Sequence, residues 1–121
     1  MAQVTNKVIE FLASPFKIDA FIEKLKHHRR LVSPIVSTDL EKIIGIKGAS
    51  FRYVIHFLRK TYPIGSGTEG YFYCYTIEDL EATRAHLRSR YISIIETDGY
   101  MEDHIKKMRG SDDLLLFGGE K

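Results

Sequence analysis

Residues 38–75 read TDLEKIIGIKGASFRYVIHFLRKTYPIGSGTEGYFYCY. This order predicts a short helix, a glycine turn, a second helix and two strand-like runs joined by a glycine-rich loop. The part between Lys42 and Thr68 contains no Asp or Glu but holds five cations, Lys42, Lys47, Arg52, Arg59 and Lys60. An acid-free basic surface is typical of a protein that binds a polyanion. The alternative is a solvated face that has no partner.

Charge is sorted along the rest of the chain as well. Residues 1–68 hold eleven Lys/Arg and five Asp/Glu, whereas residues 69–121 hold seven and eleven. A chain of 121 residues suits one domain with its own core. It contains no apolar run of the ~18 residues that a bilayer requires, and it begins without an apolar signal core. Cys74 is the only cysteine and excludes an internal disulfide. We therefore expect a cytoplasmic protein with no membrane partner.

Helix signals precede the quoted stretch. Ser14 followed by Pro15 predicts a helix that begins there and is amphipathic. Residues 1–13 form either an N-terminal arm or a short helix. Residues 31–36 are interrupted by proline, which indicates an edge strand or an extended connector.

Two helices and a hairpin are predicted within the stretch itself. Thr38 and Glu41 have the capping-box spacing that opens a short helix, and Gly45 should end it. The second helix begins at about Gly48 and has one clean apolar face, formed by Phe51, Val54, Ile55 and Leu58. The glycines of residues 65–70 are expected to supply the positive-φ positions of the hairpin.

A further helix should follow the hairpin. Thr76 with Asp79 again has capping-box spacing, and the apolar pattern continues to about Glu96, where Asp98 and Gly99 should break the helix. A short polar helix over residues 100–108 and a flexible tail over 110–121 complete the prediction. The apolar stripe of the long helix packs within its own domain or pairs two subunits; its residues are Leu80, Leu87, Tyr91 and Ile94.

The order of these elements over residues 14–75 resembles the winged helix-turn-helix proteins, especially the small ones of bacteriophages and related mobile elements. The resemblance is carried by the short helix and glycine turn, by Leu58-Arg59, by Tyr62-Pro63-Ile64, and by Gly70-Tyr71-Phe72 before a long Thr-capped helix. It implies an α+β, mainly α fold: a winged helix-turn-helix core at 14–75 with a two-stranded wing, and a C-terminal helical extension of the same domain at 76–109. It also implies a protein that binds double-stranded DNA in replication or transcriptional control, as a homodimer, in the cytoplasm of a bacterial host.

In that arrangement the second helix of the stretch is the recognition helix. Its outer face would reach the major groove, where Arg52 could bind guanine through two parallel hydrogen bonds. The alternatives are an ion pair for Arg52 and packing on the preceding helix for Tyr53. Lys47, Arg59 and Lys60 suit phosphate contacts. The predicted DNA-binding residues are Lys47, Ser50, Arg52, Tyr53, His56, Arg59, Lys60, Ser66 and Thr68.

The wing departs from a strong DNA-binding pattern. Its tip, residues 66–69, has no cation, and Glu69 would repel phosphate. The wing either contacts DNA weakly through amides and hydroxyls or serves another purpose. The competing hypothesis is therefore a protein-interaction module that recruits replication proteins and never holds DNA. A third is a single-strand binder that stacks bases on Tyr71, Tyr73 and Tyr75.

The tail segment 113–117, Asp-Leu-Leu-Leu-Phe, resembles the short motif by which bacterial replication proteins dock on the sliding clamp. The resemblance implies that Leu114, Leu116 and Phe117 bind a replication-protein partner. The alternative is that these side chains fold back onto the domain. Nothing in the sequence indicates an enzyme, a metal or a cofactor: the five histidines have no metal-ligand spacing, and no phosphate-cradling loop occurs.

Overall fold

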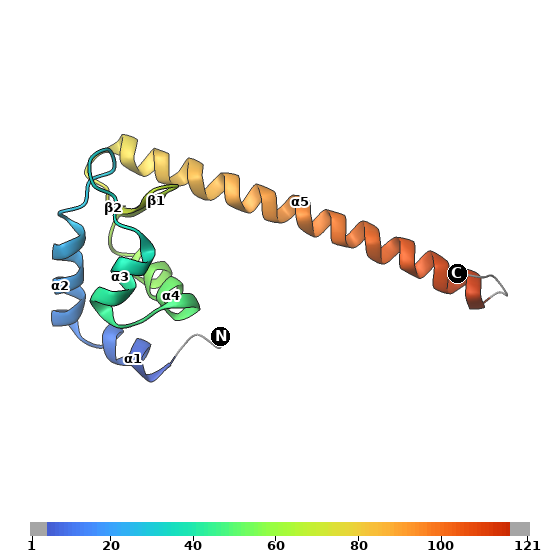
Figure 1. The fold of residues 1–121 in the computed structure, drawn as a ribbon, viewed down its shortest axis with the longest axis horizontal. Helices are drawn as coiled ribbons and strands as arrows, with labels where there is room; N and C mark the ends of the chain where they lie inside the picture. The colour runs from blue at the N-terminus through green and yellow to red at the C-terminus, as the bar shows by residue number, and fades with distance from the viewer. Residues whose placement is uncertain (1–4, 117–121) are drawn as a thin grey trace. The chain divides into compact units, whose positions relative to one another are not determined.

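The computed structural model describes the backbone of residues 5–116 and the side chains of residues 5–110. It is α+β and mainly helical (Figure 1). Its elements are α1 (Asn6–Leu12), α2 (Pro15–Leu25), α3 (Ser37–Ile44), α4 (Gly48–Leu58), β1 (Ile64–Gly67), β2 (Gly70–Tyr73) and α5 (Ile77–Leu116). Two compact units are formed, Met1–His86 and Leu87–Lys121, so the first turns of α5 belong to the first unit.

The first unit is built around a buried apolar cluster. α4 contributes the face that its periodicity predicts, with Phe51, Val54, Ile55 and Leu58 all buried. α1 contributes Val8 and Phe11 to the same cluster, so residues 6–12 form the helix that was one of the two alternatives. The compact unit also includes the N-terminal helix and residues 76–86, which lie outside the predicted core at 14–75.

Helix starts are confirmed in one case and wrong in another. Ser14 is the N-cap of α2, and its hydroxyl accepts a hydrogen bond from the Lys17 amide at 3.2 Å. α3, in contrast, begins at Ser37 with Val36 as N-cap, and no side chain caps it, so the capping box predicted from Thr38 does not form. Gly45 ends α3 with φ of 72°, the left-handed conformation that favours glycine.

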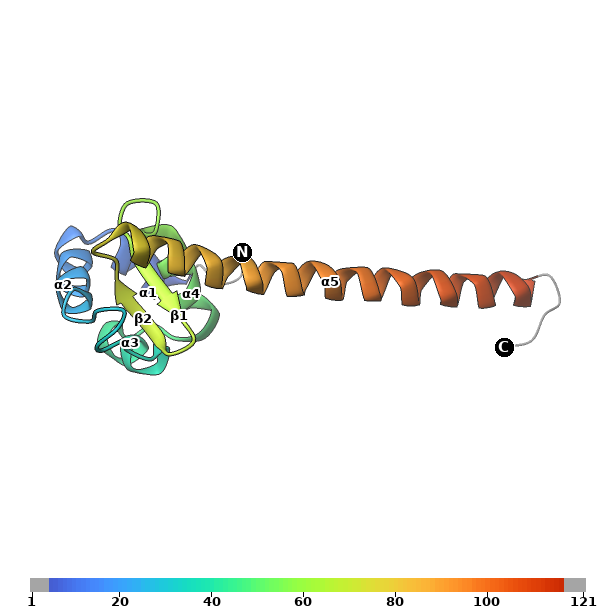
Figure 2. The ribbon, with the colours of Figure 1, turned by 90° about the horizontal axis from the view of Figure 1, so that it is seen from above.

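β1 and β2 form a two-stranded antiparallel sheet, in which Ile64 lies opposite Tyr73 and Gly67 opposite Gly70 (Figure 2). Among the hairpin glycines Gly70 alone has a positive φ, 138°, so the expectation is confirmed for Gly70 and wrong for Gly65 and Gly67. Gly65 is needed for space instead: a Cβ there would lie 2.1 Å from the Phe72 ring.

Residues 31–36 are an extended connector that touches the sheet at one point. Ile35 and Tyr71 form an isolated antiparallel bridge, with amide-to-carbonyl distances of 2.8 and 2.7 Å in the two directions. The edge of β2 is therefore covered at this pair and again at Tyr73, whose amide donates to the His28 carbonyl at 2.9 Å.

α5 is one helix of 40 residues. The predicted break at Asp98 and Gly99 does not occur, and residues 110–116 continue the helix in place of the predicted flexible tail. A single glycine inside a helix costs ~1 kcal/mol relative to alanine, which is too little by itself to break a helix. Within residues 5–116 no helix has the length and apolar character needed to span a membrane.

Candidate nucleic-acid interface

The outer face of α4 carries the exposed cations of the acid-free segment. Opposite the buried face, Arg52, His56 and Lys60 follow one another at four-residue intervals, and all three are exposed. Lys60 lies just beyond the helix end, with its ammonium 5.4 Å from the centre of the exposed Phe57 ring. The structure thus brings three of the predicted DNA-binding residues onto one ridge.

The start of α4 is held by a carboxylate of α3. The Gly48 amide donates to Glu41 Oε2 at 3.2 Å, while Lys47, at the N-cap position, offers no side-chain cap. Glu41 therefore stabilises the helix dipole and fixes the angle of the turn between α3 and α4. Its negative charge also makes that amide unavailable to a phosphate. The sequence pointed to Glu41 as part of a capping box for α3, whereas it serves the next helix.

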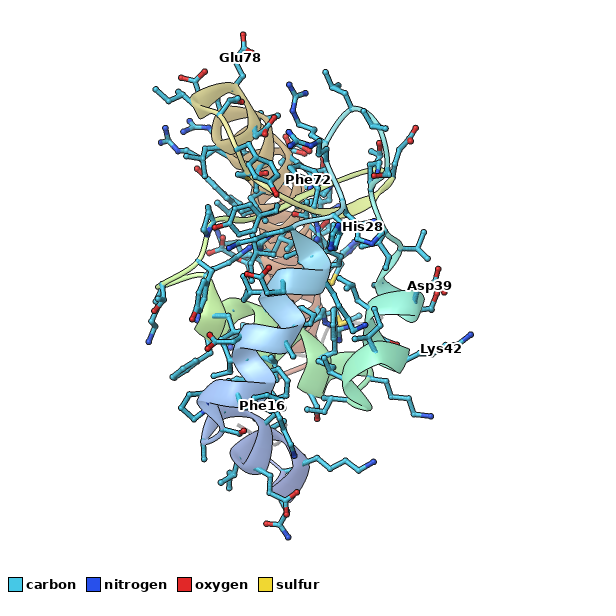
Figure 3. The ribbon with its side chains drawn as sticks, turned by 90° about the vertical axis from the view of Figure 1, so that its left-hand side faces the viewer. Phe16, His28, Asp39, Lys42, Phe72 and Glu78 are labelled. Carbon is cyan, nitrogen blue, oxygen red and sulfur yellow. The ribbon has the colours of Figure 1, made fainter. Side chains whose placement is uncertain are left out.

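A cleft of about 750 Å³ lies beside this turn, between the start of α1, α3 and the start of α4. Three lysines line it, Lys7, Lys42 and Lys47, together with Glu41. Lys42 projects outward from α3 beside Asp39 (Figure 3). The turn region is consequently basic on balance, and Lys42 and Lys47 are both exposed.

Two predicted DNA contacts point into the hairpin instead. Arg59 donates from Nε to the Ile64 carbonyl and from a terminal nitrogen to the Ser66 hydroxyl, both at 2.9 Å. Ser66 is buried, and its amide donates to Thr83 Oγ1 at 3.2 Å. The phosphate role predicted for Arg59 and the DNA contact predicted for Ser66 do not fit these positions. Thr68, at the hairpin tip beside Glu69, is exposed.

The remaining predicted α4 residues are half-buried. Tyr53 is half-buried and packs against the core cluster. Ser50 lines the cleft beside the turn. Both residues are therefore less accessible to a ligand than Arg52 and His56.

The three tyrosines of the β2 region do not form one stacking platform. Tyr71 packs edge-on against Phe51, with ring centres 5.7 Å apart, and is half-buried. Tyr73 and Tyr75 lie together at 5.1 Å, and the Arg29 guanidinium covers Tyr75 at 4.3 Å. The single-strand hypothesis requires the three rings to form one stacking surface, whereas Tyr71 packs separately from Tyr73 and Tyr75.

A polar network that the sequence did not reveal ties the first turns of α5 to the rest of the first unit. Arg30 Nε donates to Asp79 Oδ1 at 2.7 Å, and the Tyr75 amide donates to Asp79 Oδ2 at 2.9 Å. The Arg30 guanidinium holds the pKa of Asp79 below its ordinary value, despite burial acting in the opposite direction. Thr83 donates to the Asp79 carbonyl at 3.0 Å and accepts from Ser66. The signal in the sequence was only the spacing of Thr76 and Asp79, whose predicted capping bond forms at 3.0 Å.

Cys74 is 6% exposed, and burial raises the pKa of its thiol. Its sulfur lies 3.8 Å from Thr83 Oγ1, within the same network. The enclosed thiol contributes to packing in this part of the fold. Among the described residues, no three His, Cys, Asp or Glu side chains come together in a way that could hold a metal ion.

The predicted partner-binding motif falls at the edge of the described chain. The backbone of Leu114 and Leu116 belongs to α5. This part of the motif is therefore helical and not an extended peptide. Phe117 lies outside the described residues.

Comparisons with known proteins were made at three levels. No protein-family model matches the chain, and no curated protein or solved structure is significantly similar to it. Functional inference therefore depends on the site itself.

Proposed function

We propose that the protein binds double-stranded DNA as a winged helix-turn-helix, with α4 as the recognition helix. The observation that carries the proposal is the outer ridge of α4, where Arg52, His56 and Lys60 are exposed on the side opposite the buried face. A helix that anchors one side in the core and presents cations on the other is what the major groove accepts. The role in phage or mobile-element replication or transcriptional control rests on the family resemblance.

The arrangement around α4 supports the proposal in two further ways. α3 precedes α4 across a turn that Gly45 and the Glu41–Gly48 hydrogen bond define. The hairpin follows α4 directly, and the Ile35 bridge adds a third extended segment beside β2, as in the winged-helix topology. These features supply the frame in which the second helix is offered to the groove.

Different side chains would have different tasks. Arg52 has the planar fork that reads guanine O6 and N7, and His56 lies one turn further along the same ridge. Lys42, Lys47 and Lys60 suit phosphates, which give affinity without sequence information. Three phosphate contacts predict that log affinity falls with log salt with a slope of about −3 for each protein copy.

The test is a salt titration of binding to random and selected duplexes by the intact protein. Arg52→Ala should weaken a selected site by ~1 to 3 kcal/mol while it leaves random DNA less affected. Lys60→Ala should weaken all duplexes alike and reduce the salt slope by about 1. Lys17→Ala, an exposed lysine of α2 outside the acid-free segment, is the matched control and should change neither. Binding that does not vary with salt would sink the proposal.

The hairpin favours a second candidate function, a protein-interaction module without DNA. Its tip exposes Glu69, and Arg59 is turned toward Ser66, so the wing offers no cation of its own to a phosphate. A docking surface for another protein would have no need of one. Retention of the purified protein on heparin and on random duplex, with elution at moderate salt, would favour DNA; passage through both columns would favour the interaction module.

A further inference from the structure

The second unit exposes a continuous apolar seam. From residue 87 to 108, seam positions recur at alternating intervals of four and three residues along α5. The alternation of four and three residues is the heptad repeat, which allows one helix to pack along another. The positions are occupied by Leu87, Tyr91, Ile94, Asp98, Met101, Ile105 and Met108.

Exposure along this seam is high for side chains of this kind. Ile94 is 65% exposed and Met108 69%, while Tyr91, Met101 and Ile105 are about half exposed. A contiguous apolar stripe on a monomer is normally covered by a partner. The repeat spacing means that a straight helix with the same seam would cover it along its whole length.

We propose that the seam is covered by a second copy of this chain, in an antiparallel two-stranded coiled coil over residues 87–105. Charge and the single polar seam residue select this occupant and its direction. The inference does not depend on DNA binding.

A parallel, in-register pair is disfavoured by the chain's own residues. It would bring the two Asp98 carboxylates face to face inside the seam. The positions that flank a parallel seam would pair Arg90 with Ile95 and His104 with Arg109, and neither pair is attractive.

An antiparallel pair centred at residue 96 removes the Asp98 conflict, while it places Arg90 opposite His104 on one flank. Seam residues then meet as Leu87 with Ile105 and Tyr91 with Met101, and Asp98 faces Ile94 of the other copy instead of a second carboxylate. At the flanking positions Arg88 of each copy meets Glu102 of the other, and Ile95 meets its own equivalent.

Exposure permits the new ion pairs. Arg88 and Glu102 are both exposed, and the existing Lys106–Glu102 contact at 3.8 Å is a solvated surface pair. A shift of the antiparallel register by one heptad would instead oppose Arg88 with Arg109 in one direction and with Ile95 in the other, so neither shift keeps the Arg88–Glu102 pair. Charge thus selects both the direction and the register.

The first test is sedimentation of the intact protein at micromolar concentrations. We expect a dimer, and we expect Met101→Lys to give monomers because it places a charge inside the seam. Asp103→Lys introduces the same residue two positions away, on the solvent side of the helix, and should remain dimeric. A monomeric parent protein, or monomers from both variants, would overturn the proposal.

The second test addresses direction through charge exchange. Arg88→Glu and Glu102→Arg should each raise the dimer dissociation constant several-fold, and the double variant should restore it. Rescue supports the antiparallel pair, since a parallel pair does not bring these two positions together. Failure of the double variant to recover would contradict the register.

The third test measures direction as a distance between spin labels at Gly110→Cys. A side chain at this position meets nothing within 4 Å. In the proposed register the two labelled positions lie about 28 residues apart along the pair, or about 42 Å. A parallel pair would place the backbones about 10 Å apart, and the shifted antiparallel register about 32 Å; either result would overturn the proposed pairing. The parent chain treated with the same label controls for reaction at the buried Cys74.

Discussion

Arg59 and Lys60 are neighbours in the chain, yet they belong to regions with opposite uses of charge. The ridge of α4 turns its cations outward, and Lys60 stays exposed at its end. Arg59, the C-cap of α4, is turned toward the hairpin and ties the helix end to Ile64 and Ser66. A one-residue step rotates a side chain by about 100° around a helix axis, which is enough to separate solvent from the hairpin.

A count of cations in the sequence therefore overstates the positive charge that the surface offers to a ligand. Five cations occur between Lys42 and Lys60, but the structure commits one of them to the fold. Mutations in the hairpin should therefore be measured as changes in stability, and mutations on the ridge as changes in binding.

The largest effect is expected from Gly70→Ala in the hairpin. A Cβ there would lie 2.4 Å from the Ile35 carbonyl oxygen, and the φ of 138° is itself strained for alanine. We expect a loss of about 3 kcal/mol or more in the free energy of unfolding, from steric overlap and backbone strain together. Urea denaturation followed by circular dichroism measures it.

Gly67→Ala is the control within the same hairpin. Its φ is not positive, and a Cβ would meet only the Phe72 ring at an ordinary 3.9 Å. Equal losses for the two variants would show that the Ile35 bridge does not constrain the hairpin.

Asp79→Asn should come next, with a loss of about 1.5 to 3 kcal/mol at neutral pH. It removes a charged hydrogen-bond acceptor from Arg30, whose side chain is only 27% exposed. Because the pKa of Asp79 is lowered in the folded state, this stabilisation is present above its unfolded pKa of about 3.9 and is lost as the pH falls through the folded pKa.

The pH dependence separates this ion pair from a simple packing effect. The difference in unfolding free energy between parent and Asp79→Asn should shrink below about pH 4. Glu78→Gln, an exposed neighbour on the same helix turn, should show little difference at any pH. A constant difference across the acid range would mean that the Arg30–Asp79 charge pair contributes nothing.

The smallest of these losses of stability is expected at Arg59, and it tests directly whether Arg59 and Lys60 have different roles. Arg59→Ala should cost about 1 to 2 kcal/mol because it leaves the Ile64 carbonyl and the Ser66 hydroxyl without this donor. Arg59→Lys should not recover that loss, since a single ammonium cannot span both acceptors. Lys60→Ala should stay within ~0.5 kcal/mol of the parent. Thermal unfolding of the three variants decides it, and equal stability of Arg59→Ala and Lys60→Ala would remove the distinction.

Local patterns predicted much of the first unit. The period of Phe51, Val54, Ile55 and Leu58 identified the buried face of α4, and Ser14 marked the start of α2. These features depend on residues close in sequence, which is why pattern alone sufficed. The helix end predicted at Gly99 is wrong because a single glycine costs only ~1 kcal/mol inside a helix, and α5 continues through it.

The covalent order of residues was enough to establish helix periodicity, the apolar face of α4 and the acid-free run. Only the tertiary structure shows which partners the polar side chains have. Glu41 accepts from the start of α4, Arg59 donates to the hairpin, and Asp79 accepts from Arg30. Periodicity is a property of neighbours along the chain, whereas a hydrogen bond between residues 30 and 79 forms only when packing brings distant segments together.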